Sequence, residues 1–142
     1  MRFTSNVTAP PGGNPPASSP DLVPASSKLF AGQLLIKAKG YATAKFTVDL
    51  GMQHFHVVGH FSASGGAGND IQAVLADEDE FQNWINGHPA KVLYSTDKVT
   101  IGKLDVGPLA PGRYVFALNN NFSAISDKYV LAEIEARWLA RR

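Results

Sequence analysis

Apolar and polar residues alternate along most of the chain from Lys28 onward, and this pattern predicts β-strands. Successive side chains of a strand point to opposite faces, so a period of two gathers the apolar residues on one face. In Tyr41–Leu50 one parity is apolar and the other is mostly polar. In Lys128–Leu139 the predicted apolar face comprises Val130, Ala132, Ile134, Ala136 and Trp138. Alanine, glutamate and leucine also favour a helix in this last stretch, but the strict alternation favours a strand.

Glycine, proline and asparagine residues separate the alternating stretches, as turns require. The predicted strands are residues 34–38, 41–50, 53–62, 71–76, 90–95, 98–106, 113–119 and 128–139. The segment from Asp77 loses the period of two, and its acidic start predicts the first turn of a short helix that ends near Ile85. About eight short strands at regular spacing predict an all-β fold, an antiparallel and jelly-roll-like β-sandwich.

The stretch Phe61–Ile71 lies between two predicted strands and contains three glycines and Asn69. These residues tolerate a positive φ, so the stretch predicts a sharp reversal of the chain. A phosphate site is not expected at Gly65–Gly68, because the Lys-Ser/Thr pair of a P-loop and its βαβ context are absent.

Residues 1–27 differ in composition from the rest, since proline, glycine, serine and alanine dominate them. We expect an extended arm or linker here, followed by a single β-sandwich domain at 28–142. The large apolar side chains of the arm, apart from Met1, are predicted to anchor it on another subunit. They are Phe3, Val7, Leu22 and Val23.

Composition narrows the classes of function. The formal net charge of +1 gives no electrostatic drive toward nucleic acid, and no apolar run approaches the roughly 20 residues of a membrane helix. The absence of cysteine excludes disulfides, thiol catalysis and cysteine-based zinc sites within the chain. No Ser-His-acid arrangement or nucleophile elbow is present, so neither an enzyme nor a cofactor is predicted. An N-terminal signal peptide is not recognised, and a cell-surface or extracytoplasmic place would depend on a partner.

Three histidines, His54, His56 and His60, share one parity of a predicted strand with Val58. Imidazoles on one face can converge on a metal ion. His54 and His60 would lie roughly 20 Å apart along a strand, so His54 and His56 are the candidate metal ligands. The alternative is a polar, solvated outer face.

Trp84 lies among polar residues that suit carbohydrate binding, because an aromatic ring stacks on a sugar and amides bond its hydroxyls. The candidate ligand-binding residues are Trp84, Asn83, Asn86 and His88. The alternative is that Phe81 and Trp84, three residues apart, pack a short helix over the end of the sandwich.

Five acidic residues are the candidate ligands of a calcium ion. They are Asp70, Asp77, Glu78, Asp79 and Glu80, and they lack the spacing of an EF-hand loop. The alternative is a solvated helix start.

Several short pieces of the chain carry a resemblance to a known family. They are Gly59–Ile71 (GHFSASGGAGNDI), Phe81–His88 (FQNWINGH), Lys98–Gly102 (KVTIG), Leu109–Tyr114 (LAPGRY), Asn120–Ser123 (NNFS) and Lys128. Over roughly Leu29 to Trp138 the chain resembles bacterial β-sandwich domains related to the GOLD (Golgi-dynamics) family. The resemblance implies a non-enzymatic interaction module, usually attached to membrane segments or other domains, and it supplies no catalytic residues.

The sequence therefore predicts a non-catalytic interaction or assembly module that uses its N-terminal arm to dock on a protein partner or on a second copy. The alternatives are a carbohydrate-binding module at Trp84 and a metal-binding domain at His54 and His56.

Overall fold

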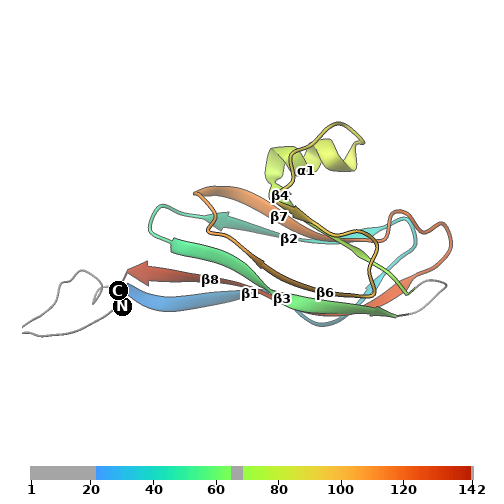
Figure 1. Cartoon of the computed structure of the whole chain (residues 1–142), viewed down its shortest axis with the longest axis horizontal. Helices are drawn as coiled ribbons and strands as arrows, with labels where there is room; N and C mark the ends of the chain where they lie inside the picture. The colour runs from blue at the N-terminus through green and yellow to red at the C-terminus, as the bar shows by residue number, and fades with distance from the viewer. Residues whose placement is uncertain (1–21, 65–68, 142) are drawn as a thin grey trace, which may run out of the picture.

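A computed structural model of the chain describes residues 22–64 and 69–141. The described residues form eight strands and one helix (Figure 1). In chain order the elements are β1 (Leu22–Ile36), β2 (Tyr41–Val48), β3 (Gln53–Ser64), β4 (Gln72–Asp77), α1 (Glu78–Ile85), β5 (Tyr94–Ser95), β6 (Ile101–Val106), β7 (Gly112–Asn119) and β8 (Lys128–Arg141).

The strands form two four-stranded antiparallel sheets that pack face to face, so the predicted all-β sandwich is confirmed. The orders are β1-β8-β3-β6 in the first sheet and β2-β7-β4-β5 in the second. The pairing is nested, since β1 pairs with β8, β2 with β7, β3 with β6 and β4 with β5. Strands from the two ends of the chain thus lie side by side (Figure 1).

The first strand is much longer than the predicted strand at 34–38. β1 begins at Leu22, so residues 22–27, which the sequence analysis assigned to the arm, pair with Ala136 to Arg141 of β8. Pro24 is compatible with this strand because β1 is the edge of its sheet, where one side of the backbone needs no hydrogen-bond donors. The composition suggested an arm because proline is disfavoured in a strand that is paired on both sides.

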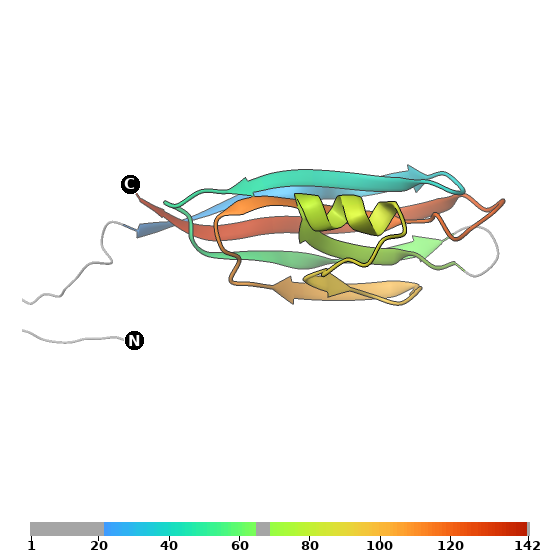
Figure 2. The same ribbon diagram turned by 90° about the horizontal axis from the view of Figure 1, so that it is seen from above.

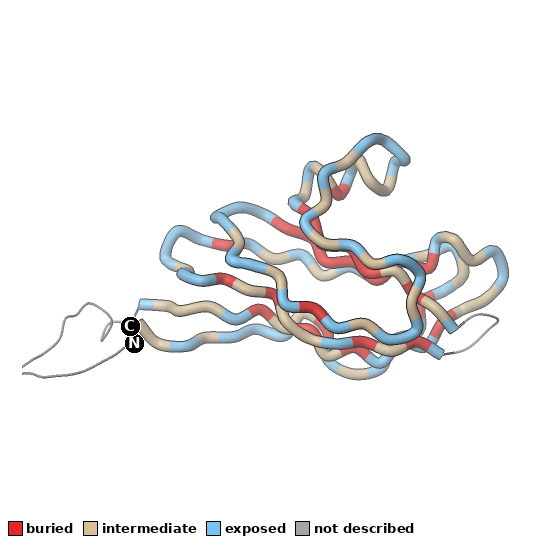
Figure 3. Tube along the Cα trace, in the orientation of Figure 1, coloured by how far each residue is buried: buried red, intermediate tan, exposed pale blue. Residues whose placement is uncertain are grey.

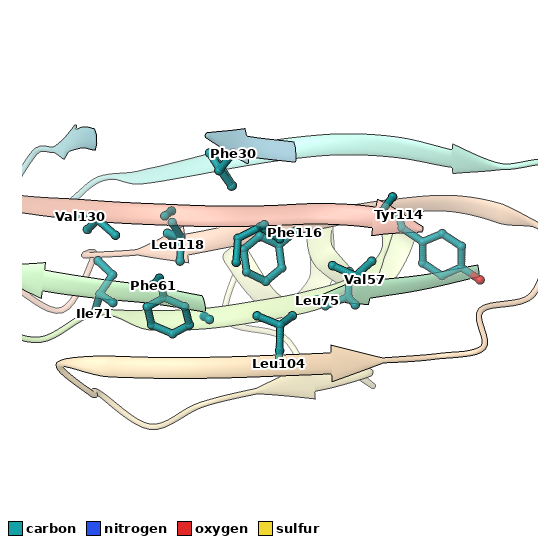
Figure 4. Close-up of a cluster of buried hydrophobic side chains, with 14 of the residues drawn as sticks. Phe30, Val57, Phe61, Ile71, Leu75, Leu104, Tyr114, Phe116, Leu118 and Val130 are labelled. Atoms are coloured by element: carbon teal, nitrogen blue, oxygen red, sulfur yellow. The ribbon is translucent and has the colours of Figure 1, made fainter. Parts of the chain in front are cut away.

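The core lies between the two sheets and is built from the faces that the alternation predicted. Val130, Ala132, Ile134 and Ala136 of β8 are buried, and Trp138 packs against them. Figure 4 shows aromatic and aliphatic side chains from both sheets meeting in this layer. Figure 3 shows the buried positions on the strands of both sheets, where they are interspersed with intermediate and exposed positions, whereas the loops are mostly intermediate or exposed.

The helix α1 begins where the sequence predicted, because the Asp77 side chain accepts a 2.8 Å hydrogen bond from the Glu80 N–H at its N-terminus. It covers the outer face of the second sheet and not the end of the sandwich (Figure 2). Phe81 packs there against Val115 and Ala117 of β7, together with Ala76 of β4. Both faces of β4 and β7 are therefore buried.

The chain passes from the first sheet to the second between β3 and β4. Gly65–Gly68 of the predicted turn lies outside the described residues. At the far side of this crossing the side chain of Lys128, only 1% exposed, donates from Nζ to both Oδ1 and the backbone oxygen of Asp70, each at 2.9 Å. The Lys128 ammonium also lies 5.1 Å from the centre of the Phe122 ring. This ion pair ties the start of β8 to the segment that enters β4.

The two partners of this pair should respond differently to substitution. We expect Asp70→Ala to lower the free energy of unfolding by about 3 kcal/mol, the lower end for a broken buried ion pair, because it leaves a buried ammonium without its anion. Lys128→Met keeps the length of the side chain and leaves only the carboxylate, which is partly open to water, so we expect a loss within about 1 kcal/mol. Urea unfolding of both variants and the double variant measures this, and equal losses from the two single substitutions would contradict it.

Candidate functional site

A polar cleft of about 310 Å³ lies where the end of α1 meets the start of β2 and the end of β7. We call it the aromatic–amide pocket. Its lining residues are Tyr41, Trp84, Ile85, Asn86, Asn119 and Asn121. They come from three separate parts of the chain, which the nested strand pairing and α1 bring together.

Three aromatic rings support one side of the aromatic–amide pocket. The buried Phe81 stacks on Trp84 with ring centres 5.8 Å apart, and it meets Tyr41 edge to face at 6.1 Å. Phe81 is itself fixed by the outer face of the second sheet. Trp84 and Tyr41 are thus held in place from below while part of each ring remains accessible, with Tyr41 44% exposed.

Three side-chain amides form the polar part of the pocket. Asn119 is buried and fixed, since its Nδ2 donates to Gln72 Oε1 at 3.0 Å and its Oδ1 accepts from the Asn121 N–H at 3.0 Å. Asn86 ends α1, and both Asn86 and Asn121 are exposed. The lining residues carry no charge. The pocket thus presents two kinds of neutral surface, which are aromatic faces and amide groups that both donate and accept hydrogen bonds.

Two of the four predicted ligand-binding residues, Trp84 and Asn86, line this pocket. Asn83 instead points its Nδ2 at Glu80 Oε1, 3.4 Å away, and His88 lies exposed in the turn after the helix. The sequence analysis did not select Tyr41, Asn119 or Asn121. The run Asn119–Asn121 was visible as a loop signal, but its proximity to Trp84 depends on the pairing of β7 with β2 and β4.

The predicted histidine face lines a larger cleft of about 580 Å³ on the outer face of the first sheet. His54, His56 and Val58 share this face as predicted, and His56 Nδ1 lies 2.9 Å from Asp105 Oδ1 of β6. His54 has a φ of 53° and sits at an irregularity in the register with β8. Within residues 22–64 and 69–141, no group of three or more His, Cys, Asp or Glu side chains is arranged to hold a metal ion.

Paired charges fill the rest of this outer face. A hydrogen bond from Arg137 is the main cause that lowers the pKa of Glu135, and the positive charges of Arg137 and Lys28 add to it. Lys28 Nζ lies 3.7 Å from Glu135 and 3.8 Å from Glu133. His60 pairs in register with Glu133 of β8 and with Lys103 of β6. The face is therefore an array of neighbouring opposite charges, which matches the solvated alternative of the sequence analysis.

Four of the five predicted calcium ligands, Asp77 to Glu80, line one cleft of about 440 Å³ together with Arg113, and Asp70 does not line it. Asp70 is paired with Lys128, whereas Asp77 caps α1 and Glu78 lies 4.0 Å from Arg113 of β7. The charge of Asp77 also acts on Tyr114. The pKa of Tyr114 is raised mainly by the burial of its side chain and, to a smaller extent, by the negative charge of Asp77.

The predicted partner-binding anchors divide into two pairs. Leu22 and Val23 are half-buried in β1, where they pair with Arg141 and Ala140 of the same chain. Phe3 and Val7 lie outside the described residues.

No protein-family model matches the sequence, and no curated protein matches it. Among solved structures, a chain from Bacillus endospore appendages, described as a novel family of disulfide-linked pili, is similar in fold. The TM-score is 0.50 with 12% sequence identity, and the match covers 96% of this chain and 99% of that chain. The likeness at this level of identity concerns the fold. Among the described residues, no helix is long and apolar enough to cross a membrane.

Proposed function

We propose that the protein is a non-catalytic structural subunit that assembles with further copies of itself, using residues 1–21 as the docking segment. The observation that carries the proposal is the position of β1. It is an edge strand, and its first residue, Leu22, pairs with Arg141 at one end of the sandwich. A segment that precedes Leu22 therefore starts from the margin of the domain and not from its core.

The docking segment has the length and composition for this task. Twenty-one residues span at most about 70 Å, which exceeds the roughly 50 Å of a 15-residue strand such as β1. Prolines restrict the segment before it binds, which lowers the entropy lost on docking. Phe3 and Val7 remain as its anchors, because Leu22 and Val23 belong to β1.

The sandwich also offers places to dock. The edges of the two sheets are β1 and β6 in one and β2 and β5 in the other, and each edge has backbone groups on its outer side that a strand from a second copy can pair with. The fold likeness to the appendage chain, which is described as belonging to pili, supports an extracellular assembly role. The GOLD-like resemblance, with its implied interaction module, agrees with a non-enzymatic role.

Such an assembly would differ from disulfide-linked pili in one chemical respect. The 142 residues contain no cysteine, so no disulfide can form within or between copies of this chain. Copies of this chain would be held by backbone pairing and apolar anchors alone. Assembly should accordingly resist reducing agents and yield to denaturants.

The test is a truncated chain that begins at Leu22, compared with the full chain by light scattering and negative-stain microscopy. We expect the full chain to form oligomers and the truncated chain to be a folded monomer with a circular dichroism spectrum rich in strand. A truncated chain that still assembles would overturn the proposal. So would a full chain that stays monomeric at about 100 µM, a concentration at which a contact with a Kd in the micromolar range is populated.

A pair of charge-matched variants separates anchoring from mere length. Phe3→Asp with Val7→Asp removes both anchors, whereas Ser5→Asp with Thr8→Asp adds the same charge and keeps them. We expect only the first variant to lose assembly.

A further inference from the structure

We propose that the aromatic–amide pocket binds one neutral pyranose ring, either a free sugar or the end residue of a glycan. This function is separate from the assembly role, and its test does not depend on assembly. The pocket combines an accessible aromatic surface, uncharged amides and a volume near the lower end of known ligand sites.

The lining of the pocket selects against charged ligands. None of its side chains is ionisable near neutral pH, because it consists of asparagines, Trp84, Tyr41 and Ile85. A phosphate, a carboxylate or a metal ion would lose its hydration there without meeting an opposite charge. The larger cleft on the first sheet differs in this respect, since His56, Asp105 and Arg137 line it.

The polar groups suit hydroxyls in particular. A sugar hydroxyl both donates and accepts a hydrogen bond, and a side-chain amide offers both functions on neighbouring atoms. Asn119 keeps one N–H and one lone pair free after its bonds to Gln72 and Asn121. Among the described residues, the amide side chains of Asn86 and Asn121 make no hydrogen bond, so both remain available to a ligand.

The aromatic side of the pocket suits the C–H face of a pyranose. Trp84 and Tyr41 present large apolar surfaces beside the amides, as in sites where one side of the ligand is apolar and its rim is polar. Phe81 fixes both rings from beneath, so little side-chain freedom is lost when a ligand binds. The pocket is thus pre-organised, which a small ligand with few contacts requires.

The experiment is saturation-transfer NMR on the full chain with sugars of matched size. The neutral probes are methyl β-glucopyranoside and methyl β-N-acetylglucosaminide, and the charged probe is methyl β-glucuronide. Chitobiose and cellobiose distinguish the end of a glycan from a free sugar. We expect transfer to the ring C–H protons of the neutral probes and at least about fivefold weaker binding of the glucuronide, the cost of an unpaired charge.

Variants locate the site. Asn86→Ala and Asn121→Ala alter exposed side chains, so the fold should survive, and each should weaken binding about fivefold through the loss of one hydrogen bond. Trp84→Phe should keep part of the binding that Trp84→Ala abolishes. His88→Ala and Asn83→Ala change neighbouring residues that do not line the pocket, and they should bind as the unaltered chain does.

Three results would overturn the proposal. The first is the absence of transfer to any neutral probe at about 20 mM, a concentration beyond the millimolar Kd of weak ligands. The second is binding of the glucuronide as strong as that of the neutral probes. The third is unchanged binding in both Asn86→Ala and Asn121→Ala.

Discussion

Gly59→Ala is expected to destabilise the protein by at least about 3 kcal/mol, because a Cβ has no room at this position. The added carbon would lie 2.1 Å from the backbone oxygen of Glu133 and 2.8 Å from the Cα of Ile134. Gly59 also has a φ of 152°, which L side chains rarely adopt. β3 is paired with β8 on one side and β6 on the other, so the strand cannot move away from the contact without breaking a ladder.

Two other glycines separate steric conflict from backbone strain in this prediction. Gly32→Ala places a Cβ in open space at a φ of 111°, so it tests strain alone, with an expected loss of about 1–2 kcal/mol. Gly51→Ala has open space and no unusual φ, and should change stability by less than about 0.5 kcal/mol. Thermal and urea unfolding of the three variants give the order. A loss at Gly59 no greater than that at Gly32 would show that the close approach of β8 is not the cause.

Asn120→Asp is expected to cost about 3–5 kcal/mol near neutral pH, although the two side chains have almost the same shape. Asn120 is fully buried, and its Nδ2 donates to the backbone oxygens of Ile36 and Lys37, both at 3.2 Å, and of Ser126 at 2.8 Å. These bonds join the turn after β1 to the loop before β8. A carboxylate oxygen in place of Nδ2 would face three acceptors and carry an unpaired charge.

The same variant should show a characteristic dependence on pH. Burial and the facing carbonyls raise the pKa of the introduced carboxyl, so the folded state holds its proton more tightly than the unfolded state does. The loss of stability should therefore be largest at neutral pH and shrink as the pH falls toward about 4, the ordinary aspartate value. Asn121→Asp at the exposed neighbouring position is the matched control and should change stability by less than about 0.5 kcal/mol. A loss that does not depend on pH would indicate that shape, not charge, is responsible.

The start of β1, which the proposed docking segment precedes, and the aromatic–amide pocket lie toward opposite ends of the sandwich. Residues 1–21 precede Leu22, which pairs with Arg141 at one end of the first sheet. The aromatic–amide pocket lies near the start of β2 and the end of β7, toward the other end (Figure 1).

The sequence alone determined the features that depend on near neighbours. The alternation placed the buried face of β8 and the strand at Tyr41, because side-chain direction follows from strand geometry within a few residues. The acidic start at Asp77 marked the beginning of α1, because an N-cap needs only the first turn. The absence of cysteine fixed the chemistry available to any assembly.

Only the tertiary structure decided which distant segments meet. β1 extends back to Leu22 because β8 is present to pair with it, and Pro24 is accepted because the outer side of β1 is an edge. Asp70 joins Lys128, and Trp84 joins Tyr41 and Asn121, across separations that no local pattern encodes. The nested pairing of strands sets these contacts. This pairing forms together with the burial of the inner faces of the two sheets against each other. The requirement to bury both inner faces acts on the whole chain, so no single stretch of sequence expresses it.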